Sequence, residues 1–205
     1  MTIKIFVIFY SRYGNTMRMA EAIAEGVKSV EGCQAELRRT AELAPPEIVK
    51  RDERWASMKE HLEKTYPLVQ TSDLKEADGA IFGSPTRFGN MASSLKDFWD
   101  QTSGIWVEGG LINKVGGCFT GSATMHGGQE TTILTMWIPM IHHGMIIAGV
   151  PYSEQVLMTT RDGGSPYGPS TVVGPMADQP PTMNDIVIAM ALGKRVAELT
   201  VKLRH

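Results

Sequence analysis

One short stretch constrains the fold more than any other: an apolar strand that leads through a polar turn into a helix. Ile3 to Tyr10 is an almost unbroken run of apolar residues, many of them β-branched or aromatic, which is typical of a strand covered on both faces in a parallel sheet. Parallel strands need crossover connections, and Ala20, Ile23 and Val27 recur at helical spacing directly afterwards. This stretch is therefore predicted to be a β–α unit.

The same alternation continues along the chain and predicts an open, twisted α/β sheet of about five parallel strands with helices on both faces. Further strands are expected at 35–39, 79–83, 115–120 and 145–148, and helices around 95–99, 133–141 and 186–200. A length of 205 residues suits one hydrophobic core, so we expect a single domain over residues 1–205.

Two segments interrupt this pattern. At about 45–70 the chain is charged, and Trp55, Met58 and Leu62 form one narrow apolar stripe, which predicts an inserted amphipathic helix docked on the body of the protein. At about 149–181, six prolines and five glycines argue against regular structure. We expect a long loop there that acts as a lid or a subunit contact.

Charge and composition exclude several classes of function. The net charge is -2, and Lys and Arg are scattered, so no nucleic-acid partner is expected. No apolar run is long enough for a membrane span, and no secretory signal is recognisable, so a cytoplasmic location is expected. Cys33 and Cys118 lack metal-ligand spacing, and the neighbouring His142 and His143 have no third ligand nearby, so no metal site is expected.

The turn Ser11-Arg12-Tyr13-Gly14-Asn15-Thr16 has the features of an anion site. It places hydroxyls and free backbone N–H groups at a helix N-terminus, and its glycine permits positive φ. The lysine of a nucleotide-triphosphate loop and the GxGxxG dinucleotide fingerprint are both absent, which favours a tightly held monophosphate. A plain hydroxyl-rich helix cap is the alternative.

Two more polar turns follow the strands expected at 79–83 and 115–120, namely residues 84–91 and 121–130. In an open parallel sheet, ligands bind beyond the carboxyl ends of the strands where strand order reverses, so these turns should meet the first one. Phe88 offers a flat apolar surface, and neighbouring N–H groups are suited to a flavin edge.

Together these motifs resemble the WrbA-like (tryptophan-repressor-binding-protein-like) NAD(P)H:quinone oxidoreductases of the flavodoxin-like superfamily. The resemblance covers nearly the whole chain; only the segment near 47–65 is longer than usual. It rests on SRYGNT at 11–16, GSPTRFGNM at 83–91, DQT at 100–102 with Trp106, GGQE at 127–130, HHGM at 142–145 and GGSPYG at 163–168.

This resemblance implies an FMN cofactor, with loop 11–16 on its phosphate, Thr86 to Phe88 at the isoalloxazine edge and residues 121–126 on the ribityl chain and ring. The implied cofactor-binding residues are Ser11, Arg12, Tyr13, Gly14, Asn15, Thr16, Pro85, Thr86, Arg87, Phe88, Gly89, Asn90, Gly121, Ser122, Ala123, Thr124, Met125, His126 and His143. The implied substrate-binding residues are Tyr13, Phe88, Trp106 and His143, and no residue is assigned as an obligatory acid or base.

The implied activity is two-electron reduction of a quinone to a hydroquinone by NADH or NADPH in a ping-pong order, in a homo-oligomer that is typically a tetramer. A one-electron flavodoxin-type carrier is one alternative, and a regulatory or DNA-associated flavoprotein is another. A flavin reductase acting on azo or nitroaromatic acceptors is a third.

Overall fold

The computed structural model describes residues 2–204 and contains one six-stranded sheet whose paired strands all run parallel. The strand order is β2-β1-β3-β4-β5, with β6 beside β4. The strands are β1 Ile3–Phe9, β2 Cys33–Arg39, β3 Gly79–Pro85, β4 Val115–Ser122, β5 Ile146–Ile147 and β6 Ser170–Val172. This is the doubly wound, flavodoxin-like order, so the predicted fold class is confirmed.

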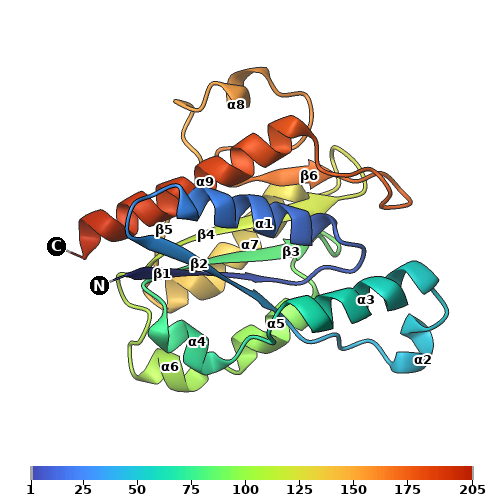
Figure 1. Ribbon diagram of the computed structural model, residues 1–205, viewed down its shortest axis with the longest axis horizontal. Coiled ribbons are helices and arrows are strands. Elements are labelled where there is room, and N and C mark those ends of the chain that lie inside the picture. The colour runs from blue at the N-terminus through green and yellow to red at the C-terminus, as the bar shows by residue number, and fades with distance from the viewer. Residues whose placement is uncertain (1, 205) are drawn as a thin grey trace.

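Helices cover both faces of the sheet (Figure 1). One face carries α1 (Asn15–Lys28) and α9 (Met183–Leu203); the other carries α4 (Thr71–Glu76), α5 (Ser93–Asp100), α6 (Ser103–Val107) and α7 (Gln129–His142). Strand β1 serves both cores, because Val7 packs with the first set and Phe6 and Ile8 with the second. None of the helices in residues 2–204 combines the length and apolarity needed to span a bilayer.

The two helices on the first face touch through glycines. A Cβ added at Gly193 of α9 would lie 2.0 Å from the carbonyl oxygen of Ile23 in α1, and one added at Gly26 would lie 2.0 Å from that of Met190. Both distances are far below van der Waals contact. The backbones of α1 and α9 therefore approach more closely than any side chain at these positions allows.

The insertion forms two helices, α2 (Pro46–Val49) and α3 (Glu53–Thr65), where one was predicted. The helix breaks at residues 50–52, and Asp52 caps α3 by accepting a hydrogen bond from the N–H of Trp55 at 3.1 Å. Trp55 and Leu62 are buried, and Leu62 belongs to the core beneath α1. The apolar stripe read from the sequence is thus the docking face of α3.

The prediction of an irregular segment at 149–181 is wrong in part. The segment contains the single-turn helix α8 (Val156–Thr159) and strand β6, whose residues 170–172 pair in parallel with Thr120–Ser122 of β4. Strand β5 pairs only with Val115 and Gly116, so the outer edge of β4 is shared between two short strands. Four β-branched or small residues between Pro169 and Gly174 are too few to predict a strand without its partner.

Candidate functional site

A cavity of about 240 Å³ lies at the carboxyl edge of the sheet, where the chain leaves β1, β3, β4 and β6 (the right-hand side of the sheet in Figure 1). We call it the main cavity. Its lining consists of Ser11, Arg12, Tyr13, Asn15, Thr16, Pro85, Thr86, Arg87, Gly121, Ser122, Ala123, Val173, Gly174, Pro175 and Ala177. Eleven of these fifteen residues are among the expected cofactor-binding residues, so the three polar turns do converge on one cavity.

Loop 11–16 opens the N-terminus of α1 toward the main cavity. Gly14 is the N-cap residue at φ +94°, and no side chain caps the helix. The Gly14 N–H donates to Ser11 Oγ at 3.1 Å, whereas the N–H groups of residues 15–17 find no acceptor among the described residues. Unsatisfied donors at a helix N-terminus attract anions, so the loop has the chemistry to bind an anionic group such as a phosphate.

The charged side chains of the main cavity are all positive. Arg12 and Arg87 line it, and its lining contains no carboxylate. Arg12 lies 3.7 Å from Asp52 and 3.7 Å above the ring of Trp55, while Arg87 donates to its neighbouring carbonyl, Thr86 O, at 2.8 Å. Two guanidinium groups and an open helix N-terminus lining one cavity favour an anionic ligand, as FMN is.

The turn after β3 is hydrogen-bonded to the end of β4 and to α7. The Thr86 N–H donates to Gly121 O at 2.8 Å, and the hydroxyls of Thr86 and Thr132 lie 2.8 Å apart. Beyond Thr86 a tight turn places Phe88 at φ 55° and Gly89 at φ 77°, and the Phe88 side chain is fully exposed. A bulky residue in the left-handed region is unusual, and here this backbone conformation goes with a Phe88 ring that is fully exposed to solvent.

Several expected residues flank the main cavity without lining it: Gly14, Phe88, Gly89, Asn90, Thr124, Met125 and His126. Trp106 and His143 line a different hollow, of about 460 Å³, between α5, α6 and α7. The two hollows share no lining residue. Within this chain, the expected substrate residues are therefore separated: Tyr13 lines the main cavity, whereas Trp106 and His143 line the other hollow.

The side chain of His143 is buried, and its ring is uncharged. Its Nε2 lies 2.8 Å from the Thr102 hydroxyl, which itself donates to Trp99 O at 2.7 Å, so Nε2 carries the ring proton and donates. Its Nδ1 is buried with no partner among the described residues. Burial, reinforced by His142, lowers the pKa of His143, which keeps the ring uncharged at neutral pH.

Sequence reasoning missed the wall formed by Val173, Gly174, Pro175 and Ala177. These residues follow β6, so they reach the cavity only because β6 pairs with the carboxyl half of β4. The available signal was the β-branched run at 171–173 ending in Gly174-Pro175, which has the form of a short strand followed by a turn.

Comparisons with known proteins agree with this geometry. A family model described as NADPH-dependent FMN reductase matches residues 3–155. A protein of Trichlorobacter lovleyi named NAD(P)H dehydrogenase (quinone) is 46% identical over 203 residues, 98% of this chain and 98% of that protein. One of the same name from Aromatoleum aromaticum is 44% identical over 198 residues, 96% and 95% of the two chains.

Solved structures give the same picture. A flavodoxin, WrbA-like protein from Agrobacterium tumefaciens superimposes with a TM-score of 0.64 at 25% identity, covering 98% of this chain and 99% of that one. A flavodoxin from the domain Archaea gives 0.61 at 21% identity, with 99% and 100% coverage, which supports the fold alone. The resemblance inferred from the motifs is confirmed by these similarities.

Proposed function

This chain belongs to the NADPH-dependent FMN reductase family and groups with the proteins named NAD(P)H dehydrogenase (quinone), and from that premise we propose that it is an FMN-dependent enzyme that transfers two electrons from NADH or NADPH to a quinone. One observation supports this most directly: an uncapped helix N-terminus opens into a cavity with two arginines and no acid. That combination suits the phosphate of FMN.

Bound FMN supplies the redox chemistry, and the protein supplies binding and orientation. In this proposal the free N–H groups of loop 11–16 bind the phosphate, and Arg12 balances its charge. Thr86, Arg87 and residues 121–123 line the rest of the cavity and would hold the ring and the ribityl chain. Tyr13 lines the same cavity and is placed to orient a flat substrate over the flavin.

The test is an absorption spectrum of the purified protein with FMN, recorded anaerobically. Adding NADH or NADPH is expected to bleach the visible flavin band, and benzoquinone is expected to restore it. Initial rates at several quinone concentrations should give parallel double-reciprocal lines, as a ping-pong order requires. If neither nicotinamide bleaches the bound FMN, the enzyme proposal fails and a one-electron carrier becomes the better description.

We further propose that the protein works as a homo-oligomer, a tetramer by the family resemblance. Leu134, Ile138 and Ile141 form an exposed apolar stripe on α7 at helical spacing, and Trp106 beside it is 56% exposed. Ile138 and Trp106 also line the hollow that contains His143. A second subunit seated on this stripe brings His143 and Trp106 to a subunit boundary, where they can complete a neighbour's substrate site.

Replacing Ile138 with aspartate is expected to lower the mass measured by light scattering after gel filtration, because a charge is costly in an apolar interface. The wild type should elute as a multiple of the 22.5 kDa chain. His61→Asp places the same charge on exposed α3 and should leave the mass unchanged. A wild-type protein with the mass of one chain would contradict the proposal.

A cytoplasmic location belongs to the same proposal. Cys33 and Cys118 are both free thiols, and Cys118 is fully buried in the core. Free thiols are typical of proteins from reducing compartments.

A further inference from the structure

The inserted helix α3 contacts the main cavity through its first turn. Arg54 donates from its two terminal nitrogens to the carbonyls of Met176 at 2.9 Å and Ala177 at 3.1 Å. Its guanidinium also lies 5.0 Å from the ring centre of Tyr13. Asp52, the cap residue of α3, accepts a hydrogen bond from the Tyr13 hydroxyl at 2.5 Å. The insertion thus binds two walls of the cavity, loop 11–16 and the turn at 173–177.

The turn at 173–177 depends on these outside contacts. Ala177 has φ 51°, a left-handed conformation that is unfavourable for a residue with a Cβ, and its N–H donates to Gly174 O at 3.0 Å. The Ala177 carbonyl accepts from Arg54 and also from Asn15 Nδ2 at 3.1 Å. Donors from α3 and from loop 11–16 therefore meet on one carbonyl and hold an intrinsically unfavourable turn.

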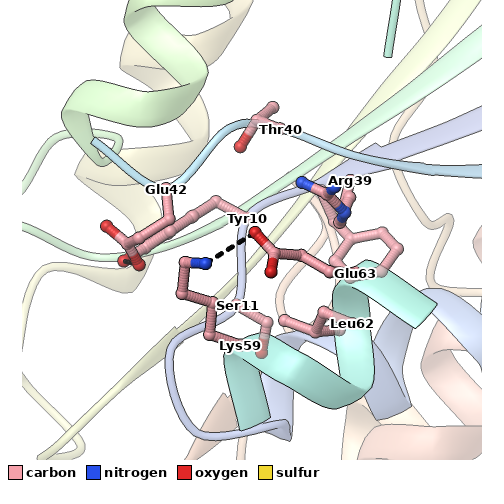
Figure 2. A pocket seen from close by; sticks show the side chains of 9 residues that line it. Tyr10, Ser11, Arg39, Thr40, Glu42, Lys59, Leu62 and Glu63 are labelled. Carbon is pink, nitrogen blue, oxygen red and sulfur yellow. Dashed lines mark hydrogen bonds and ion pairs between the residues drawn. The ribbon is translucent and has the colours of Figure 1, made fainter. Parts of the chain in front are cut away.

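Helix α3 is itself firmly seated. Trp55 is buried, its indole nitrogen donates to Glu42 at 2.8 Å, and its ring lies against Arg12. Figure 2 shows Lys59, Leu62 and Glu63 of α3 lining one small pocket together with Ser11 of loop 11–16. The cavity left between them is about 20 Å³, the size of about one water molecule. The helix is therefore a rigid support for its first turn.

The Asp52 carboxylate keeps its charge in this arrangement. The hydrogen bond from Tyr13, together with that from the Trp55 N–H, lowers the pKa of Asp52 below its usual value. Burial, followed by the Asp52 contact, raises the pKa of Tyr13, so its hydroxyl stays protonated and able to donate. Tyr13 is consequently fixed in one orientation at the wall of the cavity.

We propose that Asp52 and Arg54 are positioning residues that fasten loop 11–16 to the turn at 173–177 and so hold the main cavity closed around bound FMN. This inference rests on the proposed function. On this proposal FMN leaves when the two walls separate, and the Arg54 hydrogen bonds oppose that separation. In this view the inserted helix α3 slows the release of the cofactor.

The test is the rate at which FMN leaves the protein, followed by recovery of its fluorescence after dilution, together with its Kd. Arg54→Ala is expected to release FMN about five- to tenfold faster, because Ala177 loses one of its two external donors. Arg54 is exposed and belongs to neither hydrophobic core, so the thermal midpoint of the apoprotein should change little. Arg51→Ala is the matched control: the Arg51 side chain is exposed and makes no hydrogen bond, ion pair or ring contact with the described residues, so wild-type release is expected.

Two further variants separate a fastening role from simple charge attraction. Arg54→Lys keeps the charge but lacks the planar guanidinium group that reaches both carbonyls. This variant should therefore release FMN about as fast as Arg54→Ala. Tyr13→Phe removes the bond to Asp52, and its effect should be less than additive with that of Arg54→Ala. Wild-type release by Arg54→Ala, or full restoration by Arg54→Lys, overturns the inference. A wild-type protein that binds no FMN overturns the proposed function first, and this inference with it.

Discussion

Asn15→Asp is expected to weaken FMN binding about 100-fold, the largest effect on ligand binding that we predict for a single substitution. Asn15 lines the main cavity at the first position of α1, beside the free N–H groups of loop 11–16. Aspartate has nearly the same shape but adds a negative charge where the phosphate must sit. A 100-fold loss corresponds to about 2.8 kcal/mol, at 1.4 kcal/mol for each factor of ten. Fluorescence titration of the apoprotein with FMN measures it.

Two measurements distinguish repulsion between the new carboxylate and the phosphate from damage to the fold. An acid in the first turn favours the helix dipole, so the apoprotein should unfold at the same temperature as the wild type or slightly higher. Asn15→Ala is the control: it also loses the bond to the Ala177 carbonyl but adds no charge, so its affinity should fall by only about tenfold. Equal losses for the two variants would show that the phosphate does not bind at this helix end.

Gly193→Ala is expected to destabilise the protein by about 3 kcal/mol, the upper part of the range for overpacking. The added methyl group would lie 2.0 Å from the Ile23 carbonyl oxygen and 3.1 Å from the Val27 nitrogen, both backbone atoms of α1. Relief requires α1 and α9 to move apart along their whole contact. Thermal unfolding should show a midpoint lower by roughly 6–12 °C, at 2–4 °C for each kcal/mol in a domain of this size.

Gly104→Ala makes the same chemical change without the clash. Gly104 lies in α6, and a Cβ added there meets nothing within 4 Å. Alanine is a better helix former than glycine by about 1 kcal/mol, so this variant should be as stable as the wild type or more stable. If Gly193→Ala behaves like Gly104→Ala, the close approach of α1 and α9 is contradicted.

The sequence was sufficient for the features that local pattern determines. The run at 3–10 must be buried on both faces, and it is: Val7 and Ile8 point into opposite cores. Loop 11–16 could be predicted to face a ligand, since it follows a buried parallel strand directly and so lies at the carboxyl edge of the sheet, where ligands bind. The predicted boundaries of these strands and helices differ little from those in the structure, because a strong hydrophobic pattern identifies such elements clearly.

The features that were missed depend on tertiary partners. Strand β6 is three residues long and gains its stability from β4, so its own sequence carries almost no signal. The contacts of Arg54 with residues 176 and 177 join segments more than 120 positions apart. The distance between Trp106 and the main cavity likewise follows from how α6 and α7 pack, which no spacing in the sequence reports.

Because β4 pairs with β5 at one end and with β6 at the other, the main cavity can be assembled only in a certain order. A growing chain that has reached Ile147 possesses five strands and the turns after β1, β3 and β4, yet it still lacks the wall at 173–177. That wall lies beyond residue 155, where the match to the family model ends. The main cavity is therefore completed only when the chain up to residue 177 has emerged from the ribosome and β6 has paired with β4.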